Sequence, residues 1–170
     1  SAFTALLNTI EELGCWPSGI EAALAVLIPK PKGGVRPIGM FAGLYRVWAR
    51  ARRPEAAKWE RCNDHPCFAA KEQNGAIDTV WDQAFRSERA TCKGDAAAAV
   101  LLDMRAFYEH FDHDLLVERA HAAGFPSRIT KLALAAYRGT RYVTQDGKIS
   151  APMKAARGVI AGCGFATTWV

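Results

Sequence analysis

Hydrophobic residues at helical spacing mark three parts of the chain. Over residues 2–13 they recur three and four positions apart, and Gly14 follows as a stop signal. Residues 43–60 predict two short helices separated at Pro54, because proline interrupts helical hydrogen bonding. A further apolar stripe over residues 77–85 predicts another helix.

Two later helices are predicted from their capping residues. Asp112 precedes the helical pattern of residues 113–122, and Ser127 precedes that of residues 128–138. Short polar side chains of this kind accept hydrogen bonds from the first free N–H groups of a helix. A glycine follows each pattern, as is typical at the end of a helix.

Short β-prone runs separated by turn residues predict two hairpins. At about residues 24–41, two such runs flank the sequence KPKGG, whose prolines and paired glycines suit an exposed, basic tip. Within residues 141–153 an Asp-Gly pair separates two further runs. Residues 157–170 are expected to form a glycine-marked loop that enters a helix.

The alanine-rich run at residues 96–102 bears most directly on function. It is short, follows Gly94 and ends in Val-Leu-Leu-Asp, which favours a strand buried on both faces with Asp103 at its end. Together with the helices and hairpins, this strand predicts an α+β fold in which helices pack on a small, mostly antiparallel sheet.

Composition favours a folded, intracellular protein. The chain has 170 residues, half of them hydrophobic, which is enough for one domain with a core. It has no apolar run of about eighteen residues and no recognisable secretory leader, so we expect a soluble chain. Its five irregularly spaced cysteines are expected to be reduced thiols. Because both ends interrupt a predicted element, we interpret the sequence as a segment of a longer protein.

Basic residues are concentrated near the start of the chain. They outnumber acidic residues by 22 to 17, which gives a formal net charge of +5. Residues 30–36 and 46–53 together hold seven basic residues and no acidic one. This clustering favours a polyanionic partner, although a solvated basic face would have the same composition.

Asp103 is the first candidate for chemistry. Metal-dependent phosphoryl transfer needs hard oxygen ligands that are held rigidly, and the end of a buried strand provides such support. An aspartate that only ends a strand or caps a helix is the structural alternative. Two metal ions also need a carboxylate from another element, and Glu109, Asp112 and Asp114 lie on or near the following helix, where they are expected to point elsewhere.

Two groups of His, Cys and Asp residues are weaker metal candidates. Residues 62–67, CNDHPC, have Cys-x2-His-x-Cys spacing without a clear fourth ligand, whereas zinc sites typically bring four. His110, Asp112 and His113 form the other group. The sequence contains no Gly-x-Ser-x-Gly elbow, no phosphate-binding P-loop and no dinucleotide fingerprint.

Three segments taken together resemble the reverse transcriptase family, especially its group II intron, retron and non-LTR retroelement branch. Residues 101–116, LLDMRAFYEHFDHDLL, are similar to the first palm motif. Residues 27–39, LIPKPKGGVRPIG, resemble the fingers hairpin, and residues 157–170, RGVIAGCGFATTWV, resemble the second palm motif. The motifs follow the family's order over about residues 24–170.

The resemblance implies a right-hand polymerase architecture. It places a fingers-like region at residues 1–95 and a partial palm at residues 96–170, which ends before the Asp-Asp hairpin. Asp103 would be catalytic and would bind Mg²⁺ as one ligand of a two-metal site. Tyr108 would pack under the sugar of the incoming nucleotide and exclude a 2′-hydroxyl. The implied partners are an RNA template, a DNA primer and deoxynucleoside triphosphates, with no membrane.

Basic and glycine positions receive binding roles from the same resemblance. Arg36 matches the fingers arginine that grips the triphosphate, and Lys30 lies near its lysine partner. Gly158 and Gly162 would let the backbone approach the nucleotide and the template closely. Contacts to nucleic acid are expected from four other basic residues, namely Lys32, Arg46, Arg50 and Arg157.

Two features depart from the family pattern. Ala161 and Ala166 stand where the glycine loop usually has Gln and then Ser, and the Tyr-x-Asp-Asp hairpin that carries the remaining metal ligands is not in the sequence. We therefore expect a fragment of an RNA-directed DNA polymerase, a nucleotidyltransferase, that is inactive as an isolated chain. The alternatives are a non-catalytic nucleic-acid-binding remnant of a retroelement and a palm fragment of an RNA-dependent RNA polymerase, against which Tyr108 argues.

Overall fold

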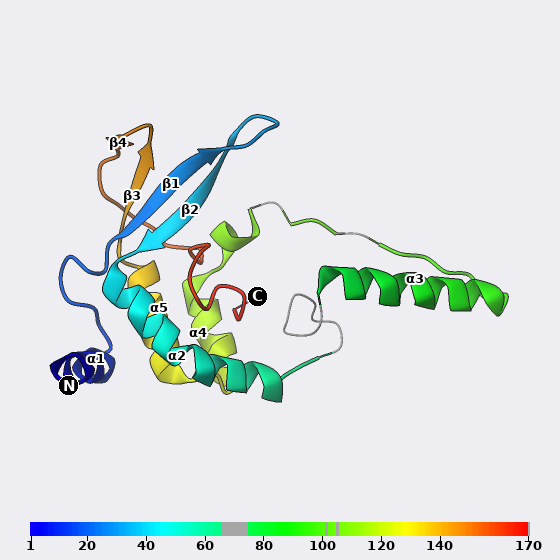
Figure 1. Cartoon of the computed structure of the whole chain (residues 1–170), viewed down its shortest axis with the longest axis horizontal. Helices are drawn as coiled ribbons and strands as arrows, with labels where there is room; N and C mark the ends of the chain where they lie inside the picture. Colours follow the sequence, from blue (N-terminus) through cyan, green and yellow to red (C-terminus); the bar gives the residue numbers. More distant parts are fainter. Residues whose placement is uncertain (66–74, 101, 105, 170) are drawn as a thin grey trace. The chain divides into compact units, whose positions relative to one another are not determined.

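The computed structural model describes residues 1–65, 75–100, 102–104 and 106–169 (Figure 1). The chain divides into a larger compact unit, Ser1–Glu60 with Ala106–Val170, and a smaller one, Arg61–Arg105. The elements confirm an α+β class. Among the helices of the described residues, none combines the length and the hydrophobicity needed to cross a bilayer.

The larger unit contains a small mixed sheet. Its strands are β1 (Ala23–Pro29), β2 (Val35–Phe41), β3 (Thr140–Gln145), β4 (Lys148–Ile149) and β5 (Met153–Lys154). The order is β2-β1-β3-β4, and β5 also pairs with β3. Only the β1–β3 pairing is parallel among the described strands, so the prediction of a mostly antiparallel sheet is confirmed.

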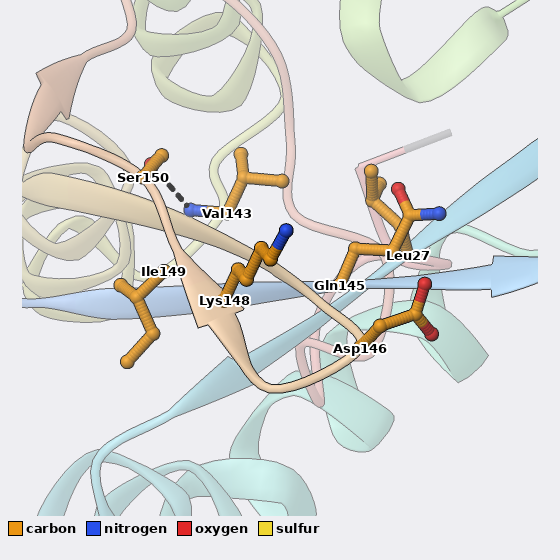
Figure 2. A pocket seen from close by; sticks show the side chains of 7 residues that line it. All are labelled: Leu27, Val143, Gln145, Asp146, Lys148, Ile149 and Ser150. Atoms are coloured by element: carbon orange, nitrogen blue, oxygen red, sulfur yellow. Dashed lines mark hydrogen bonds between the residues drawn. The ribbon is translucent and has the colours of Figure 1, made fainter.

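Both predicted hairpins form. β1 and β2 pair antiparallel along their whole length, and the N–H of Lys30 donates to the carbonyl of Gly34 at 3.0 Å to close the turn. The β3–β4 turn contains Asp146 at φ 50° and Gly147 at φ 75°, the left-handed pair that a tight hairpin turn requires. Beside this turn lies a hollow of about 440 Å³, and Figure 2 shows the residues that line it.

Helices α1, α4 and α5 agree closely with the sequence patterns. α1 spans Ala2–Leu13, and Gly14 ends it in the left-handed conformation at φ 66°. α4 spans His113–Ala122, and the Asp112 side chain accepts from two N–H groups of its first turn. α5 spans Ser127–Tyr137, so the predicted cap residue is instead its first residue and makes no capping hydrogen bond.

α2 is one helix, Gly43–Cys62, with Pro54 inside it, so the prediction of two short helices was wrong. Proline removes one helical hydrogen bond and crowds the preceding turn. Trp48 before the proline and Ala56 after it are both buried, with exposed fractions of 1% and 0%. Packing on both sides of Pro54 therefore stabilises the continuous helix against the cost of the proline.

The predicted buried strand at residues 96–102 was also wrong. The described residues of this stretch lie outside any helix or strand, and no strand pairing among the described residues includes them. Val100 and Leu102 are 81% and 88% exposed. A strand buried on both faces needs hydrogen-bonded neighbours, which a run of apolar residues does not guarantee.

Two other segments complete the comparison with the sequence patterns. α3 (Ala76–Cys92) forms in the smaller unit as predicted, with its apolar stripe exposed. The last segment was expected to be a glycine-marked loop that enters a helix, but its described residues, 157–169, form irregular structure and turns without a helix. The division into residues 1–95 and 96–170 concerns function and stays a prediction.

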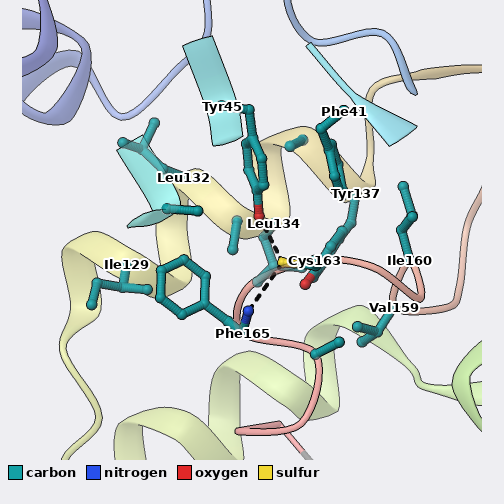
Figure 3. Close-up of a cluster of buried hydrophobic side chains, with 14 of the residues drawn as sticks. Phe41, Tyr45, Ile129, Leu132, Leu134, Tyr137, Val159, Ile160, Cys163 and Phe165 are labelled. Carbon is teal, nitrogen blue, oxygen red and sulfur yellow. Dashed lines mark hydrogen bonds between the residues drawn. The ribbon is translucent and has the colours of Figure 1, made fainter. Parts of the chain in front are cut away.

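Aromatic side chains build the core of the larger unit (Figure 3). The ring of Tyr45 lies 5.4 Å from that of Trp16 and 5.5 Å from that of Trp48, at the tilted angles that aromatic pairs favour. Its hydroxyl lies 3.0 Å from the sulfur of Cys163. Burial raises the pKa of both Tyr45 and Cys163, so these groups stay neutral and Cys163 anchors the last segment in the core.

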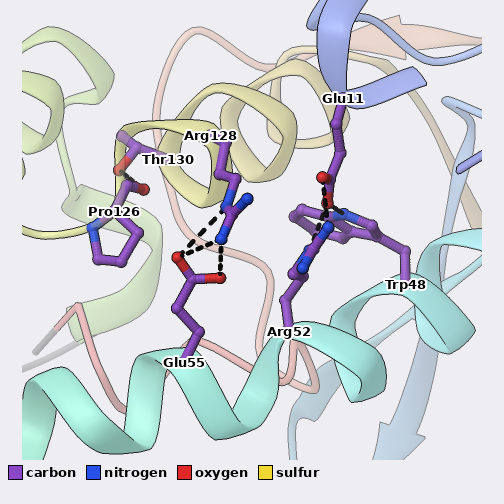
Figure 4. Close-up of polar contacts among 7 residues, drawn as sticks. All are labelled: Glu11, Trp48, Arg52, Glu55, Pro126, Arg128 and Thr130. Carbon is purple, nitrogen blue, oxygen red and sulfur yellow. Dashed lines mark hydrogen bonds and ion pairs between the residues drawn. The ribbon is translucent and has the colours of Figure 1, made fainter. Parts of the chain in front are cut away.

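A polar cluster joins α1 to α2 (Figure 4). Arg52 donates to both carboxylate oxygens of Glu11, and the indole N–H of Trp48 donates to one of them at 2.7 Å. Burial acts to raise the pKa of Glu11, but the hydrogen bonds from Arg52 and Trp48, together with the positive charges of Arg52 and Arg128, outweigh burial and lower it. The ionised carboxylate is therefore favoured in the folded chain.

Replacing Glu11 by Gln is expected to lower the free energy of unfolding at pH 7 by about 1–2 kcal/mol, because charge-assisted hydrogen bonds are removed. A lowered folded-state pKa contributes stability above the ordinary value of 4.5 and loses it as pH falls through the folded value. The difference between Glu11→Gln and the unmodified chain should therefore shrink by pH 3. Urea unfolding at both pH values measures it.

Glu12→Gln is the matched control, since the neighbouring Glu12 is exposed. This control should change the unfolding midpoint little at either pH. A Glu11→Gln variant as stable as the unmodified chain at pH 7, or one whose deficit persists at pH 3, would contradict the role assigned to the cluster.

Candidate functional site

The glycine loop, defined here as residues 157–164, is hydrogen-bonded to the segment that carries Tyr108. The N–H of Val159 donates to the carbonyl of Tyr108, and that of Gly158 donates to the carbonyl of Phe111, both at 2.8 Å. Tyr108 lies in a short 3-10 helix, η1 (Phe107–His110), and is half-buried. Two segments that carry separate motifs of the resemblance are therefore neighbours in space.

Gly158 permits this close approach. Its φ is 93°, and a Cβ at this position would lie 3.1 Å from the carbonyl oxygen of Glu109 and 3.3 Å from that of Tyr108. A side chain would therefore be strained and crowded. The backbone that Gly158 approaches is that of the chain itself, and Gly158 is buried. Its assigned contact with a nucleotide stays a prediction.

The carbonyl oxygen of Gly158 is held by two buried or half-buried side chains. Arg141 donates to it at 3.1 Å and also donates to the carbonyl of Tyr137 at 2.9 Å. The Nε2 atom of His113 lies 3.0 Å from the same oxygen. Burial lowers the pKa of Arg141.

Sequence reasoning missed both of these positioning residues. His113 was considered only as a weak metal candidate, and Arg141 was not singled out. They lie 45 and 17 residues away from Gly158 in the chain, so no local pattern connects them to the glycine loop.

The glycine loop also contacts the base of the β1–β2 hairpin. The N–H of Gly39 donates to the carbonyl of Ala161 at 3.2 Å. A Cβ at Gly39 would lie 1.9 Å from a methyl carbon of Ile160, so no larger residue fits without displacement of the loop. The β1–β2 hairpin and the segment that carries Tyr108 therefore both form hydrogen bonds with the glycine loop.

The Lys and Arg side chains within positions 30–36 and 46–53 differ in whether they form ion pairs. Arg52 pairs with Glu11, and Arg53 pairs with Glu60 at 2.7 Å. The other five are exposed and make no ion pair within the described part of the chain; they are Lys30, Lys32, Arg36, Arg46 and Arg50. The predicted basic surface therefore consists of the hairpin tip and one face of α2.

Arg157 is partly engaged within the chain. Its Nε lies 3.9 Å from a carboxylate oxygen of Asp112, and the two residues also form an isolated β-bridge. Hydrogen bonds from the N–H groups of Leu115 and Asp114 are the main cause that lowers the pKa of Asp112. Arg157 itself is exposed, so it remains accessible to a polyanion.

A hollow of about 390 Å³ lies between α2 and the glycine loop. Arg46 and Arg50 line it together with Gly162, so it joins three residues that the sequence assigned to binding. The hollow beside the β3–β4 turn contains no predicted site residue. The exposed side chains of Asp146 and Lys148 in Figure 2 carry opposite charges, and that hollow shows no charge preference.

Asp103 lies in the smaller unit, where it is exposed and outside any helix or strand. Within the described residues, no group of three or more His, Cys, Asp or Glu side chains is placed to hold a metal ion. Cys67 of the CNDHPC segment lies outside those residues, and the other four cysteines are free thiols. A two-metal site needs several carboxylates, and the described residues do not supply that set.

No protein-family model matches the sequence, and no curated protein matches it either.

Proposed function

We propose that the chain is part of a reverse transcriptase, a template-directed nucleotidyltransferase that makes DNA on an RNA template. The main support is that the glycine loop is hydrogen-bonded to the backbone of Tyr108 and also to that of Gly39 in the β1–β2 hairpin. The three segments that contain these residues are far apart in the sequence. Their convergence supports a common binding function.

In the proposed enzyme, the larger unit supplies nucleotide and nucleic-acid contacts. Arg36 and Lys30 are exposed at the hairpin and carry no competing ion pair within the described residues. A planar guanidinium suits bidentate contact with a triphosphate. The carbonyl of Tyr108 accepts a hydrogen bond from the N–H of Val159. This bond holds the backbone that carries the Tyr108 ring, which in the proposed enzyme discriminates between sugars.

In the proposed enzyme Asp103 would be one ligand of Mg²⁺. The described residues do not group the other carboxylates that a two-metal site needs. In the proposed enzyme the chemistry of the ion would be to stabilise charge on the transferred phosphoryl group.

A second candidate function is that of a non-catalytic nucleic-acid-binding remnant of a retroelement. The irregular, exposed backbone around Asp103 favours it, because a catalytic carboxylate needs rigid support. Both candidates bind nucleic acid through the basic surface, and only the first adds nucleotides.

The role of Asp103 is tested in a form of the protein that adds nucleotides. Asp103→Asn should abolish Mg²⁺-dependent extension of a DNA primer on an RNA template, because it removes the charge but keeps the volume. Asp95→Asn is the matched control, since Asp95 is an exposed carboxylate in the same stretch. Near-normal extension by Asp103→Asn, or equal loss in both variants, would contradict a catalytic Asp103.

Tyr108→Val should raise the use of ribonucleotides relative to deoxynucleotides in the same form of the protein. The smaller side chain opens space beside C2′ of the sugar. Tyr108→Phe keeps the ring and should keep the ratio. Competition between the two substrates in primer extension measures the change, and an unchanged ratio in Tyr108→Val would leave Tyr108 with a packing role only.

The hairpin tip is expected to bind an RNA–DNA duplex without sequence preference. Replacing Lys30, Lys32 and Arg36 together by Ala should flatten the salt dependence of binding by up to about one unit of log–log slope for each phosphate group that the variant no longer neutralises. Fluorescence anisotropy over a salt series measures the slope.

The control for this experiment replaces three exposed lysines of the larger unit that lie outside the hairpin, namely Lys131, Lys148 and Lys154. It removes the same charge and should change the slope less. Binding that is undetectable or insensitive to salt in the unmodified chain, or equal slopes in the two triple variants, would refute the assignment of the hairpin.

A further inference from the structure

We infer that the hollow between α2 and the glycine loop binds a phosphate group. The shared ligand chemistry is a tetrahedral phosphate oxyanion, which either a nucleic-acid backbone or a nucleoside triphosphate can supply. The inference concerns a binding step, uses the proposed function only to choose the probes, and does not depend on nucleotidyl transfer.

Two guanidinium groups with no ion pair line one wall of the hollow. Arg46 and Arg50 lie four residues apart on α2, about 6 Å along the helix axis, so both side chains lie on the same face. Both are exposed, and neither has an ion pair among the residues that the structure describes. Paired arginines of this kind suit an anion that has several oxygen acceptors.

The opposite wall consists of backbone. Gly162 and Gly164 line the hollow without side chains, and both are exposed. Their N–H groups donate no hydrogen bond to the described part of the chain. Free N–H groups of a glycine-rich turn are donors that commonly bind anions. The hollow therefore combines two kinds of hydrogen-bond donor that suit a phosphate group, guanidinium groups and backbone N–H groups.

The charge balance of the hollow also favours an anion. No acidic residue lines it among the described residues. Arg53 lines it as well, but this residue is paired with Glu60 and donates to the hydroxyl of Thr168 at 3.2 Å. The positive charge left uncompensated at the hollow is therefore that of Arg46 and Arg50.

The floor of the hollow keeps the space open. Phe41 and Tyr45 are buried beneath it, with their rings stacked at 4.1 Å. Ala49 and Gly164 also line it, and a Cβ at Gly164 would lie only 3.6 Å from that of Ala49. Small residues on both walls leave a volume of about 390 Å³, which lies within the usual range of ligand pockets.

The test compares two double variants of the full chain that remove the same charge from the same helix. Arg46→Gln with Arg50→Gln removes the guanidinium groups of the hollow. Lys58→Gln with Arg61→Gln removes two exposed charges of α2 that do not line it. Circular dichroism checks that both variants fold, as expected for exposed positions.

Two probes distinguish the sources of phosphate. A fluorescein-labelled single-stranded DNA 12-mer is followed by anisotropy, and deoxythymidine triphosphate is followed by calorimetry. The variant of the hollow should weaken binding of at least one probe by about tenfold or more, since it removes charge-assisted hydrogen bonds. The control should weaken binding by less than about threefold.

Loss confined to the 12-mer identifies a phosphodiester backbone as the ligand, and loss confined to the triphosphate identifies a nucleotide; either supports the inference. Equal weakening in the two double variants overturns it, as does an unmodified chain that binds neither probe. If a form of the protein that also carries the remaining metal ligands binds phosphate but extends no primer, the proposed polymerase function fails and this inference stands.

Discussion

The larger unit depends on the hydrogen bonds around Gly158. Its carbonyl oxygen accepts from Arg141 and lies within hydrogen-bond distance of His113, while the N–H groups of Gly158 and Val159 donate to the segment that holds Tyr108. A buried backbone group that loses its partner costs about 1–3 kcal/mol. One loop therefore forms hydrogen-bond contacts with β3, α4 and the segment that contains η1.

The arginines of α2 have two different roles. Arg52 pairs with Glu11 of α1, and Arg53 pairs with Glu60 of the same helix, so these two arginines add no uncompensated charge. Arg46 and Arg50, which line the hollow beside Arg53, have no ion pair among the described residues. Paired arginines stabilise the fold, whereas unpaired ones repel each other until an anion binds. The helix thus carries arginines that are paired within the chain and two that are available to a polyanion.

Local patterns were sufficient for most elements and insufficient for the site. Both hairpins follow from their turn residues, and α4 follows from the cap at Asp112, because these signals act over a few residues. The break expected at Pro54 was wrong because tertiary burial of Trp48 and Ala56 outweighed local propensity. Arg141 and His113, which contact the carbonyl of Gly158, are distant from it in the sequence, so no local pattern predicted these contacts.

In the segment before Asp103, hydrophobicity alone did not predict the structure. Val100 and Leu102 would each gain about 1.5–3 kcal/mol from full burial, yet both are exposed in an irregular stretch. Apolar residues favour burial, but a strand also needs backbone partners for its N–H and C=O groups. The composition of this stretch therefore specifies a preference for a partner strand and does not specify which one. A catalytic role for Asp103 requires such support, because a carboxylate that positions an ion must be held rigidly by the residues around it.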